Sequence, residues 1–514
     1  MPIRMDEDSP QQGQSPNRGG RSNPILSFLP MILGFVFRRP KLIIPVLVVG
    51  GIWYFFLGGK NVFSGVPGEE STSEFSLGAN LDPEVYDRAE VFEPLTYGSF
   101  GAGGGLPASV SLAKYAPKRL HQGNQGSCVG WASSYAARTI LEAETSGAEP
   151  NQAAFSPSFL YNQIALQNCQ GAYMLDAMET MRKGGVLPFR EYPYDDSSCS
   201  DVPGPNEQAR AQTFRIKGYN RLTMGGEDYR PDMQGIKQHL AQGSPVVIGM
   251  QVGGTFMHDM RGQRIWNPTQ RDYSLYGFSG HAMCVIGYDN NYEGGAFQLM
   301  NSWGETWGEK GIAWVRYKDF EFFVKEAYGL HPMGATPAMD PNKLEVQFGL
   351  VDNATQSIIP LLQASDRVFR TKAPIRKGDK FKIAIANSIE CHIYVFGEET
   401  DGSSYVLFPY TAKHSPYCGI TGTRLFPKDY SMTADDLGNR DRIAVLITKE
   451  AIDFKAFNER INKSAGLNYG AKLQSALAGQ SIPNVKFLAG EAIGFSCEIG
   501  SKNAVGVVLE IDKK

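Results

Sequence analysis

The stretch HQGNQGSCVGWASSYAA, residues 121–137, decides the fold of the longest globular region. A loop rich in glutamine and glycine leads into Cys128, and small and apolar residues at helical spacing follow it. A helix start favours a thiolate, because it supplies partial positive charge and free backbone N–H groups. Gln122 adds a possible oxyanion donor, and Gly126 permits a tight turn. The stretch leaves two interpretations open: a nucleophile at a helix start, or a small buried cysteine.

Two motifs further along the chain favour the catalytic interpretation. GHAMCVIGYD places His281 at the start of an apolar strand, and FQLMNSWGETWGEKGIAWV places Asn301 at the end of the next strand. On adjacent strands the asparagine carbonyl can accept from one ring nitrogen while the other nitrogen faces the thiolate. Trp303 is expected to shield that contact from water. We therefore predict Cys128, His281 and Asn301 as the catalytic residues.

These motifs resemble those of the papain-like cysteine peptidases. QGNQGSC is similar to their glutamine-to-nucleophile segment, GHAMCVIGYD to their histidine strand and NSWGETWGEKG to their asparagine block. The resemblance implies an α+β papain-like two-lobed catalytic domain over residues 106–335, with a helical lobe, a β-barrel lobe and a substrate cleft between them. It also implies that Gln122 lies in the oxyanion hole, and that Trp303 and Gly126 are structural residues near the site.

The sequence departs from the family pattern beside the nucleophile. Gln125 and Val129 stand where the family has a cysteine and an aromatic residue, and Trp131 can replace the aromatic. The first-lobe disulfide that uses that upstream cysteine is therefore absent. The resemblance implies a bond between Cys169 and Cys199 instead, with two surface thiols as the alternative.

Length and composition set the broad class of protein. A chain of 514 residues with 42% hydrophobic and 20% charged residues predicts two or three folded units of ordinary globular character. A formal net charge of −3 argues against a nucleic-acid-binding surface, which normally carries a basic excess. Histidine and cysteine spacing predicts no metal site, and no cofactor is expected.

The N-terminal region has the pattern of a membrane tether. Residues 1–41 are expected to form a disordered, basic cytoplasmic tail, and the uncharged segment 42–59 a transmembrane helix. The basic excess before that segment places everything after it outside the cytoplasm, on the periplasmic side of a bacterial inner membrane. A buried core helix is the alternative for 42–59. Segment 25–37 is expected to lie at the membrane interface, or to form half of a hairpin, which would reverse the topology.

A Gly- and Ser-rich stretch, residues 60–105, is expected to form a flexible linker. It is shorter than the long inhibitory propeptide typical of the family, so the sequence leaves the control of activity unexplained.

Residues 343–514 alternate as half-exposed strands, with two short helical stretches near 453–463 and 471–478. The pattern predicts a mainly β, sandwich-like domain. KGDKFKIAIANSIECHIYVFGEETDGSSYVLFPYT weakly resembles a bacterial domain of unknown function found attached to peptidases. The resemblance implies an accessory module, possible binding of a protein partner, and no chemistry of its own.

The leading functional hypothesis is a membrane-anchored thiol peptidase that hydrolyses protein or peptide substrates through an acyl-enzyme. Two alternatives stay open: an acyl transferase or amidase that acts on cell-wall peptides, and a non-catalytic scaffold with a papain-like fold. The sequence does not give substrate specificity, because the loops that build the pockets cannot be placed from it.

Overall fold

The computed structural model describes residues 3–7, 75–96, 106–223, 229–333, 342–428, 430–488, 490 and 492–514. The two segments expected to contact a membrane, 25–37 and 42–59, lie outside these ranges. Within the described ranges, no helix combines the length and apolar character needed to cross a bilayer.

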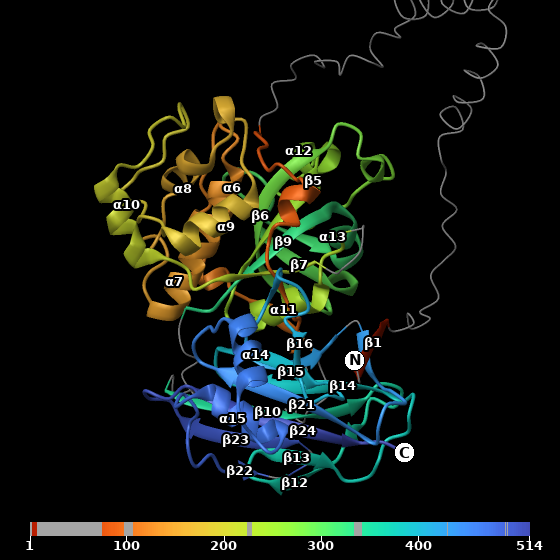
Figure 1. The fold of residues 1–514 in the computed structure, drawn as a ribbon. Helices are drawn as coiled ribbons and strands as arrows, with labels where there is room; N and C mark the ends of the chain where they lie inside the picture. Colours follow the sequence, from red (N-terminus) through yellow and green to blue (C-terminus); the bar gives the residue numbers. More distant parts are fainter. Residues whose placement is uncertain are drawn as a thin grey trace, which may run out of the picture. The chain divides into compact units, whose positions relative to one another are not determined.

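Residues 106–333 form two lobes, and the first is helical (Figure 1). Its central feature is one continuous helical stretch made of α6 (Cys128–Gly130), the π-helical η3 (Trp131–Arg138) and α7 (Thr139–Ser146). The other helices of this lobe are α8 (Pro157–Ile164), α9 (Met174–Lys183) and α10 (Pro205–Ala211). Ser156 caps α8: its hydroxyl oxygen accepts from the backbone N–H of Phe159 at 3.0 Å.

The second lobe is an antiparallel sheet in which the described strands follow the order β4-β9-β5-β6-β7-β8, with β3 also paired to β6. The strands are β3 (Ser109–Ser111), β4 (Tyr219–Arg221), β5 (Val246–Val252), β6 (Ser279–Asp289), β7 (Ala296–Met300), β8 (Ile312–Arg316) and β9 (Val324–Leu330). The helices that accompany them are α11 (Met233–Ala241), α12 (Gly254–His258) and α13 (Tyr317–Phe323).

The second lobe is an open sheet and not the closed barrel that the resemblance implies. Strands β4 and β8 do not pair with each other among the described strands. A loop covers the edge of β8 instead: the N–H of Trp314 donates to the carbonyl of Arg264, and the N–H of Trp266 to the carbonyl of Trp314. These two bonds pair the backbone N–H and carbonyl of Trp314 on the free side of β8. This edge therefore does not need a further strand to satisfy them.

Part of the stretch 60–105, expected to be a flexible linker, is ordered, and the expectation is wrong for residues 75–96; residues 60–74 and 97–105 lie outside the described ranges. Residues 75–96, here called the strap, contain α5 (Pro83–Tyr86) and β2 (Val91–Phe92). Phe75, Val85 and Tyr86 are buried in the same hydrophobic core as the two lobes. Composition suggested a spacer, but the strap gains its order from these long-range contacts, which local composition does not reveal.

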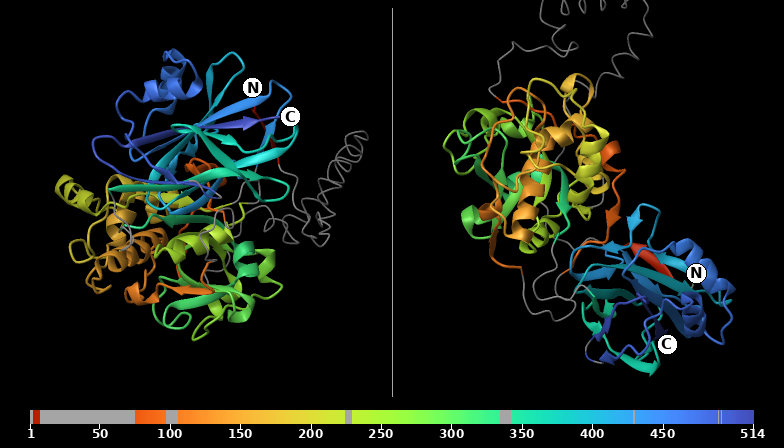
Figure 2. Two further views of the ribbon diagram at one scale, coloured as in Figure 1. Left: turned by 90° about the horizontal axis from the view of Figure 1, so that it is seen from below. Right: turned by 90° about the vertical axis from the view of Figure 1, so that its left-hand side faces the viewer.

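Residues 342–514 form a β-rich domain of two sheets, as predicted (Figures 1 and 2). One sheet contains β10 (Lys343–Asp352), β11 (Ile358–Ile359), β14 (Lys380–Asn387), β19 (Gly422–Phe426), β20 (Tyr430–Ala434), β22 (Phe487–Leu488) and β23 (Ile493–Glu498). The other contains β12 (Leu361–Ser365), β13 (Val368–Thr371), β15 (Cys391–Glu398), β16 (Ser404–Phe408), β18 (Tyr417–Cys418), β21 (Arg440–Thr448) and β24 (Ala504–Asp512). A separate short strand, β17 (His414–Ser415), pairs with β2 of the strap.

Alternating side chains explain why the two sheets pack as a sandwich. On β15, Ile393 and Val395 enter the core between the sheets, while Tyr394 and Phe396 point to the opposite face. Helices α14 (Phe454–Lys463) and α15 (Tyr469–Leu477) cover that opposite face.

The first residues of the chain are also ordered in part, contrary to the disordered tail predicted for residues 1–41. Strand β1 (Ile3–Glu7) pairs with β20 of the β-rich domain and so satisfies the backbone groups of an edge strand.

Candidate active site

Cys128 is the first residue of the long helical stretch, as the sequence predicts, and its side chain is fully buried. The backbone N–H of Ala282, on β6 of the other lobe, points to its sulfur at 3.4 Å. Free N–H groups at a helix start and this N–H from the sheet both favour negative charge on the sulfur. The thiol therefore lies where the two lobes meet.

His281 and Asn301 are joined by a hydrogen bond of 2.7 Å between the imidazole Nε2 and the side-chain Oδ1. The same Oδ1 accepts from the backbone N–H of Ser302 at 2.7 Å, so Oδ1 is the acceptor and Nε2 carries the proton. Nδ1 of His281 has no partner within the described chain. In the neutral ring this nitrogen is the free base, as the chemistry of proton transfer from a thiol requires.

Trp303 lies over the imidazole as a flat cover. The two rings stack with centroids 4.3 Å apart, and the indole is fully buried. Because the indole excludes water, the hydrogen bond between His281 and Asn301 does not compete with solvent.

The side chain of Gln122 is held in one orientation by three hydrogen bonds. Its Oε1 accepts from the hydroxyl of Ser302 at 2.6 Å, which leaves the side-chain nitrogen as the donor. That nitrogen donates to the backbone carbonyls of Gln125, in the loop before Cys128, at 2.9 Å and of Ser76 at 3.2 Å. If Ser76 moves away, the nitrogen gains a free N–H.

Burial keeps the cysteine and the histidine uncharged in this structure. It raises the pKa of the Cys128 thiol to about 11, against the lowering effect of nearby backbone N–H groups. It lowers the pKa of the His281 imidazole to about 4, although the hydrogen bond to Asn301 opposes this shift. The resting pair is therefore a neutral thiol beside a neutral imidazole at pH 7.

Comparisons with known proteins agree with this geometry. Residues 107–327 match the family model described as papain family cysteine protease. This part of the chain is a papain-family cysteine peptidase domain.

Several relatives share this domain. The chain is 28% identical over 217 residues to mouse cathepsin K, covering 41% of this chain and 60% of that protein. It is 28% identical over 260 residues to an uncharacterized peptidase C1-like protein of Acanthamoeba polyphaga mimivirus, covering 49% of this chain and 76% of that protein. Among solved structures it is similar to xylellain, a cysteine protease from Xylella fastidiosa, at 23% identity and a TM-score of 0.41, covering 52% of this chain and 98% of that one.

The strap occupies the cleft of the peptidase domain. The N–H of Ala79 donates to the carbonyl of Gly280 at 3.1 Å, next to the catalytic histidine. On the other lobe, the N–H of Ala172 donates to the carbonyl of Gly78 at 2.9 Å. Both the Gln122 amide and the Trp303 indole N–H donate to the carbonyl of Ser76, each at 3.2 Å. The strap thus bonds to both lobes and to the side chains of Gln122 and Trp303.

Gly78 brings the strap close to the nucleophile. Its backbone N–H is among the groups that oppose the burial-driven rise in the pKa of the Cys128 thiol. A methyl group on Gly78 would lie 2.0 Å from the carbonyl oxygen of Gly126. Only glycine fits here, and Gly126, predicted as a structural residue, forms the opposing wall.

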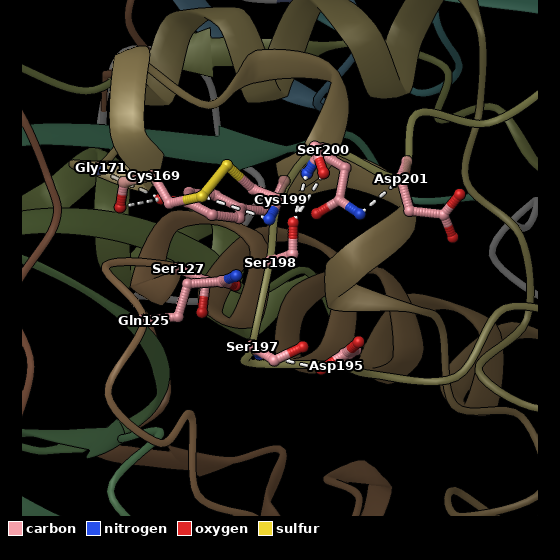
Figure 3. The surroundings of a disulfide bond; sticks show 12 residues. Gln125, Ser127, Cys169, Gly171, Asp195, Ser197, Ser198, Cys199, Ser200 and Asp201 are labelled. Carbon is pink, nitrogen blue, oxygen red and sulfur yellow. Dashed lines mark hydrogen bonds between the residues drawn. A yellow bond between two sulfur atoms is a disulfide. The ribbon is translucent and has the colours of Figure 1, made fainter.

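Cys169 and Cys199 are joined by a disulfide, as the resemblance implies (Figure 3). The bond lies next to the nucleophile loop: a methyl group on Gly126 would meet the carbonyl oxygen of Cys169 at 3.2 Å. By linking residues 30 apart, the disulfide fixes the segment that carries Gly171 and Ala172 along the cleft.

A cavity of about 410 Å³ opens beside the cleft, and Leu81 and Glu326 both line it. Glu326 is directly paired with Gly249 across β5 and β9, and only 5% of it is exposed. Leu81 lies over the same glycine: a methyl group on Gly249 would come within 2.4 Å of its Cδ2. The strap therefore places an apolar side chain beside a buried carboxyl, and burial raises the pKa of Glu326 to about 8.

Glu326 and the strap are the parts of the site that sequence reasoning missed. KEAYGL around Glu326 does not mark its carboxyl as buried, and FSLGANL at residues 75–81 has no motif. The sequence does contain one indication of this contact. Gly78 and Ala79 are small, and small residues allow the backbone of a segment to pack closely against another part of the chain. Among the described residues, no group of three metal-ligating side chains is present.

We predict that Gly78→Ala opens the cleft, because the added methyl has no room against Gly126. Alkylation of Cys128, followed by intact mass, should be slow in the unmodified chain at pH 7 and should rise only as the pH approaches 11. In Gly78→Ala, alkylation should already be rapid at pH 7, because water reaches the sulfur and burial no longer disfavours its negative charge. The control is Gly500→Ala, whose methyl would meet nothing within 4 Å. Equal rates at pH 7 in both variants would refute a strap that covers the thiol.

Proposed function

We propose that this chain is a latent thiol-dependent peptidase that hydrolyses peptide bonds through an acyl-enzyme. The observation that carries the proposal is the hydrogen bond from His281 Nε2 to Asn301, which leaves Nδ1 available as a base, together with the contact of the Cys128 sulfur with the N–H of the next residue, Ala282. The match of residues 107–327 to the papain family supports the same chemistry.

The reaction follows from the positions of these groups. His281 takes the proton of Cys128, and the sulfur attacks the carbonyl carbon of the substrate. The backbone N–H of Cys128 and the amide of Gln122 hold the oxyanion, and the imidazolium then protonates the leaving amine. Water, activated by the same histidine, releases the acyl group and restores the thiol. Asn301 keeps the ring in the required tautomer throughout.

Latency follows from the strap, because the substrate and residues 75–81 compete for the same hydrogen-bonding groups. The carbonyl of Gly280 and the amide of Gln122 are both used by the strap. Hydrolysis therefore requires the strap to leave the cleft.

Catalytic roles are best tested in the opened Gly78→Ala background with a fluorogenic peptide mixture. Cys128→Ala should abolish hydrolysis, and Gln122→Ala should lower kcat by about 100- to 1,000-fold through the loss of one oxyanion donor. Asn301→Ala should lower kcat by at least about tenfold, because the imidazole loses its orienting partner.

Gln163→Ala, on α8 of the helical lobe, is the matched control and should keep full activity. Hydrolysis that survives Cys128→Ala would contradict the proposal.

The buried carboxyl of Glu326 gives an expected preference for substrates. Once Leu81 leaves the cavity, an incoming lysine or arginine side chain can pair with Glu326, which ionises more readily beside a cation. In the opened enzyme, kcat/KM should favour a basic over a leucine side chain at the position that enters this cavity. Glu326→Gln should reduce that preference at least about tenfold, with unchanged alkylation of Cys128. A leucine preference in both enzymes would show that another cation, such as Arg221, neutralises the carboxyl.

We further propose that residues 25–59 attach the chain to a membrane, with the peptidase domain outside the cytoplasm. The disulfide supports an oxidising compartment, and the pairing of β1 with β20 supports the hairpin alternative, which keeps residues 3–7 on the same side as the β-rich domain. Arg38, Arg39 and Lys41, between the two apolar segments, would then lie on the cytoplasmic side.

Alkaline carbonate extraction of cell membranes tests the attachment. The full chain should stay in the pellet, and a variant without residues 25–59 should appear in the supernatant. Recovery of the full chain in the supernatant would contradict the attachment.

A further inference from the structure

The strap has a second half that does not touch the catalytic cleft. After α5, residues 91–96 run along the β-rich domain, where β2 pairs in parallel with β17. The N–H of Val91 donates to the carbonyl of Lys413 at 2.9 Å, and the N–H of Thr96 to the carbonyl of Thr423 at 2.7 Å. One short segment is thus bound at one end by the peptidase domain and at the other by the β-rich domain.

A buried arginine forms the centre of this second attachment. Arg424 on β19 is only 2% exposed, and its Nε donates to the backbone carbonyl of Glu93 at 3.1 Å. The rest of its guanidinium is held by Asn387 Oδ1 and the carbonyl of Ile420, both at 2.7 Å. Because the β-rich domain fixes the guanidinium by itself, the Nε donor is already aimed at the strap.

The side chain of Glu93 completes the attachment. It is 7% exposed, and its Oε1 accepts from the backbone N–H of Lys428 at 2.8 Å. Leu95 lies against Gly422, where a methyl group would approach its Cδ2 to 3.1 Å. The surface thus fits an extended segment with one acidic and one apolar side chain two residues apart.

We propose that the β-rich domain is a clamp that holds residues 91–96 and thereby keeps residues 75–81 in the catalytic cleft. The inference rests on the proposed function, because it assigns the control of that same site. The strap is held at two places, by the catalytic cleft and by the clamp. While one half stays bound, the other half remains close to its own site, so its rebinding is intramolecular and each attachment raises the occupancy of the other. Release from the clamp then opens the cleft, even though the clamp touches no catalytic residue.

The test uses substitutions in the strap, so that the β-rich domain itself is unchanged. Glu93→Ala in the full chain should raise the rate of Cys128 alkylation at pH 7 at least about tenfold, because the charge-assisted hydrogen bond to Lys428 is lost. Glu93→Gln keeps an acceptor oxygen and should stay nearer to the unmodified rate. Glu90→Ala, the same change at an exposed strap residue, is the matched control and should have no effect.

A synthetic peptide of residues 89–96, AEVFEPLT, should likewise speed alkylation of the unmodified chain by competing for the clamp, and the same peptide with alanine for Glu93 should not. If Glu93→Ala reacts like Glu90→Ala while Gly78→Ala reacts rapidly, the clamp is refuted and the covering strap stands. If Glu93→Ala reacts rapidly but no peptide is hydrolysed, the clamp stands and the peptidase proposal fails.

Discussion

The hydrogen bond from the backbone of Ala282 to the sulfur of Cys128 is the point on which the arrangement of the site depends. It joins the start of a helix in one lobe to the second residue after Gly280 in the other. Strand β6 therefore fixes the thiol, the imidazole of His281 and the carbonyl of Gly280 relative to one another. Strand β7 then delivers Asn301 beside the imidazole. Any change in the register between β6 and β7 would move Asn301 away from the imidazole that it orients.

The polar groups beside the proposed catalytic residues also hold the strap. The carbonyl of Gly280 accepts from the backbone of Ala79, and the side-chain amide of Gln122 donates to the carbonyl of Ser76. Burial of Cys128 and His281 raises the pKa of the thiol and lowers the pKa of the imidazole. In the proposed account, departure of the strap both frees these polar groups and admits water to the two titratable side chains.

Sequence reasoning succeeded where short-range patterns carry the information. The residues around Cys128, His281 and Asn301 identify a helix start and two strands. The structure joins His281 to Asn301 by a hydrogen bond and places the sulfur of Cys128 against the backbone N–H of Ala282, the residue after His281. The sandwich of residues 343–514 followed from alternation along its strands. The strap was missed because its order comes from main-chain bonds to Gly280 and Ala172, far away in the chain, and no side-chain pattern records such bonds.

Glu326 was missed for a related reason. A glutamate is rarely buried, and this one is covered by residues distant in the sequence, including Leu81, Pro83 and Tyr86 of the strap, which line the same cavity. The first strand and the open sheet of the second lobe likewise depend on edge contacts that propensity does not encode. The candidate catalytic residues were therefore easier to predict than the proposed regulation by the strap. The catalytic residues belong to local motifs, whereas the position of the strap depends on tertiary contacts.

The central claim is that the strap and a ligand of Cys128 exclude each other from one cleft. Amide hydrogen exchange over residues 75–96, measured before and after a peptide-like thiol inhibitor has modified Cys128, tests this most directly. The account predicts slow exchange in the unmodified chain and fast exchange over the same residues once the inhibitor is bound. Equal protection in both states would contradict it, because the strap and the inhibitor would then occupy different places.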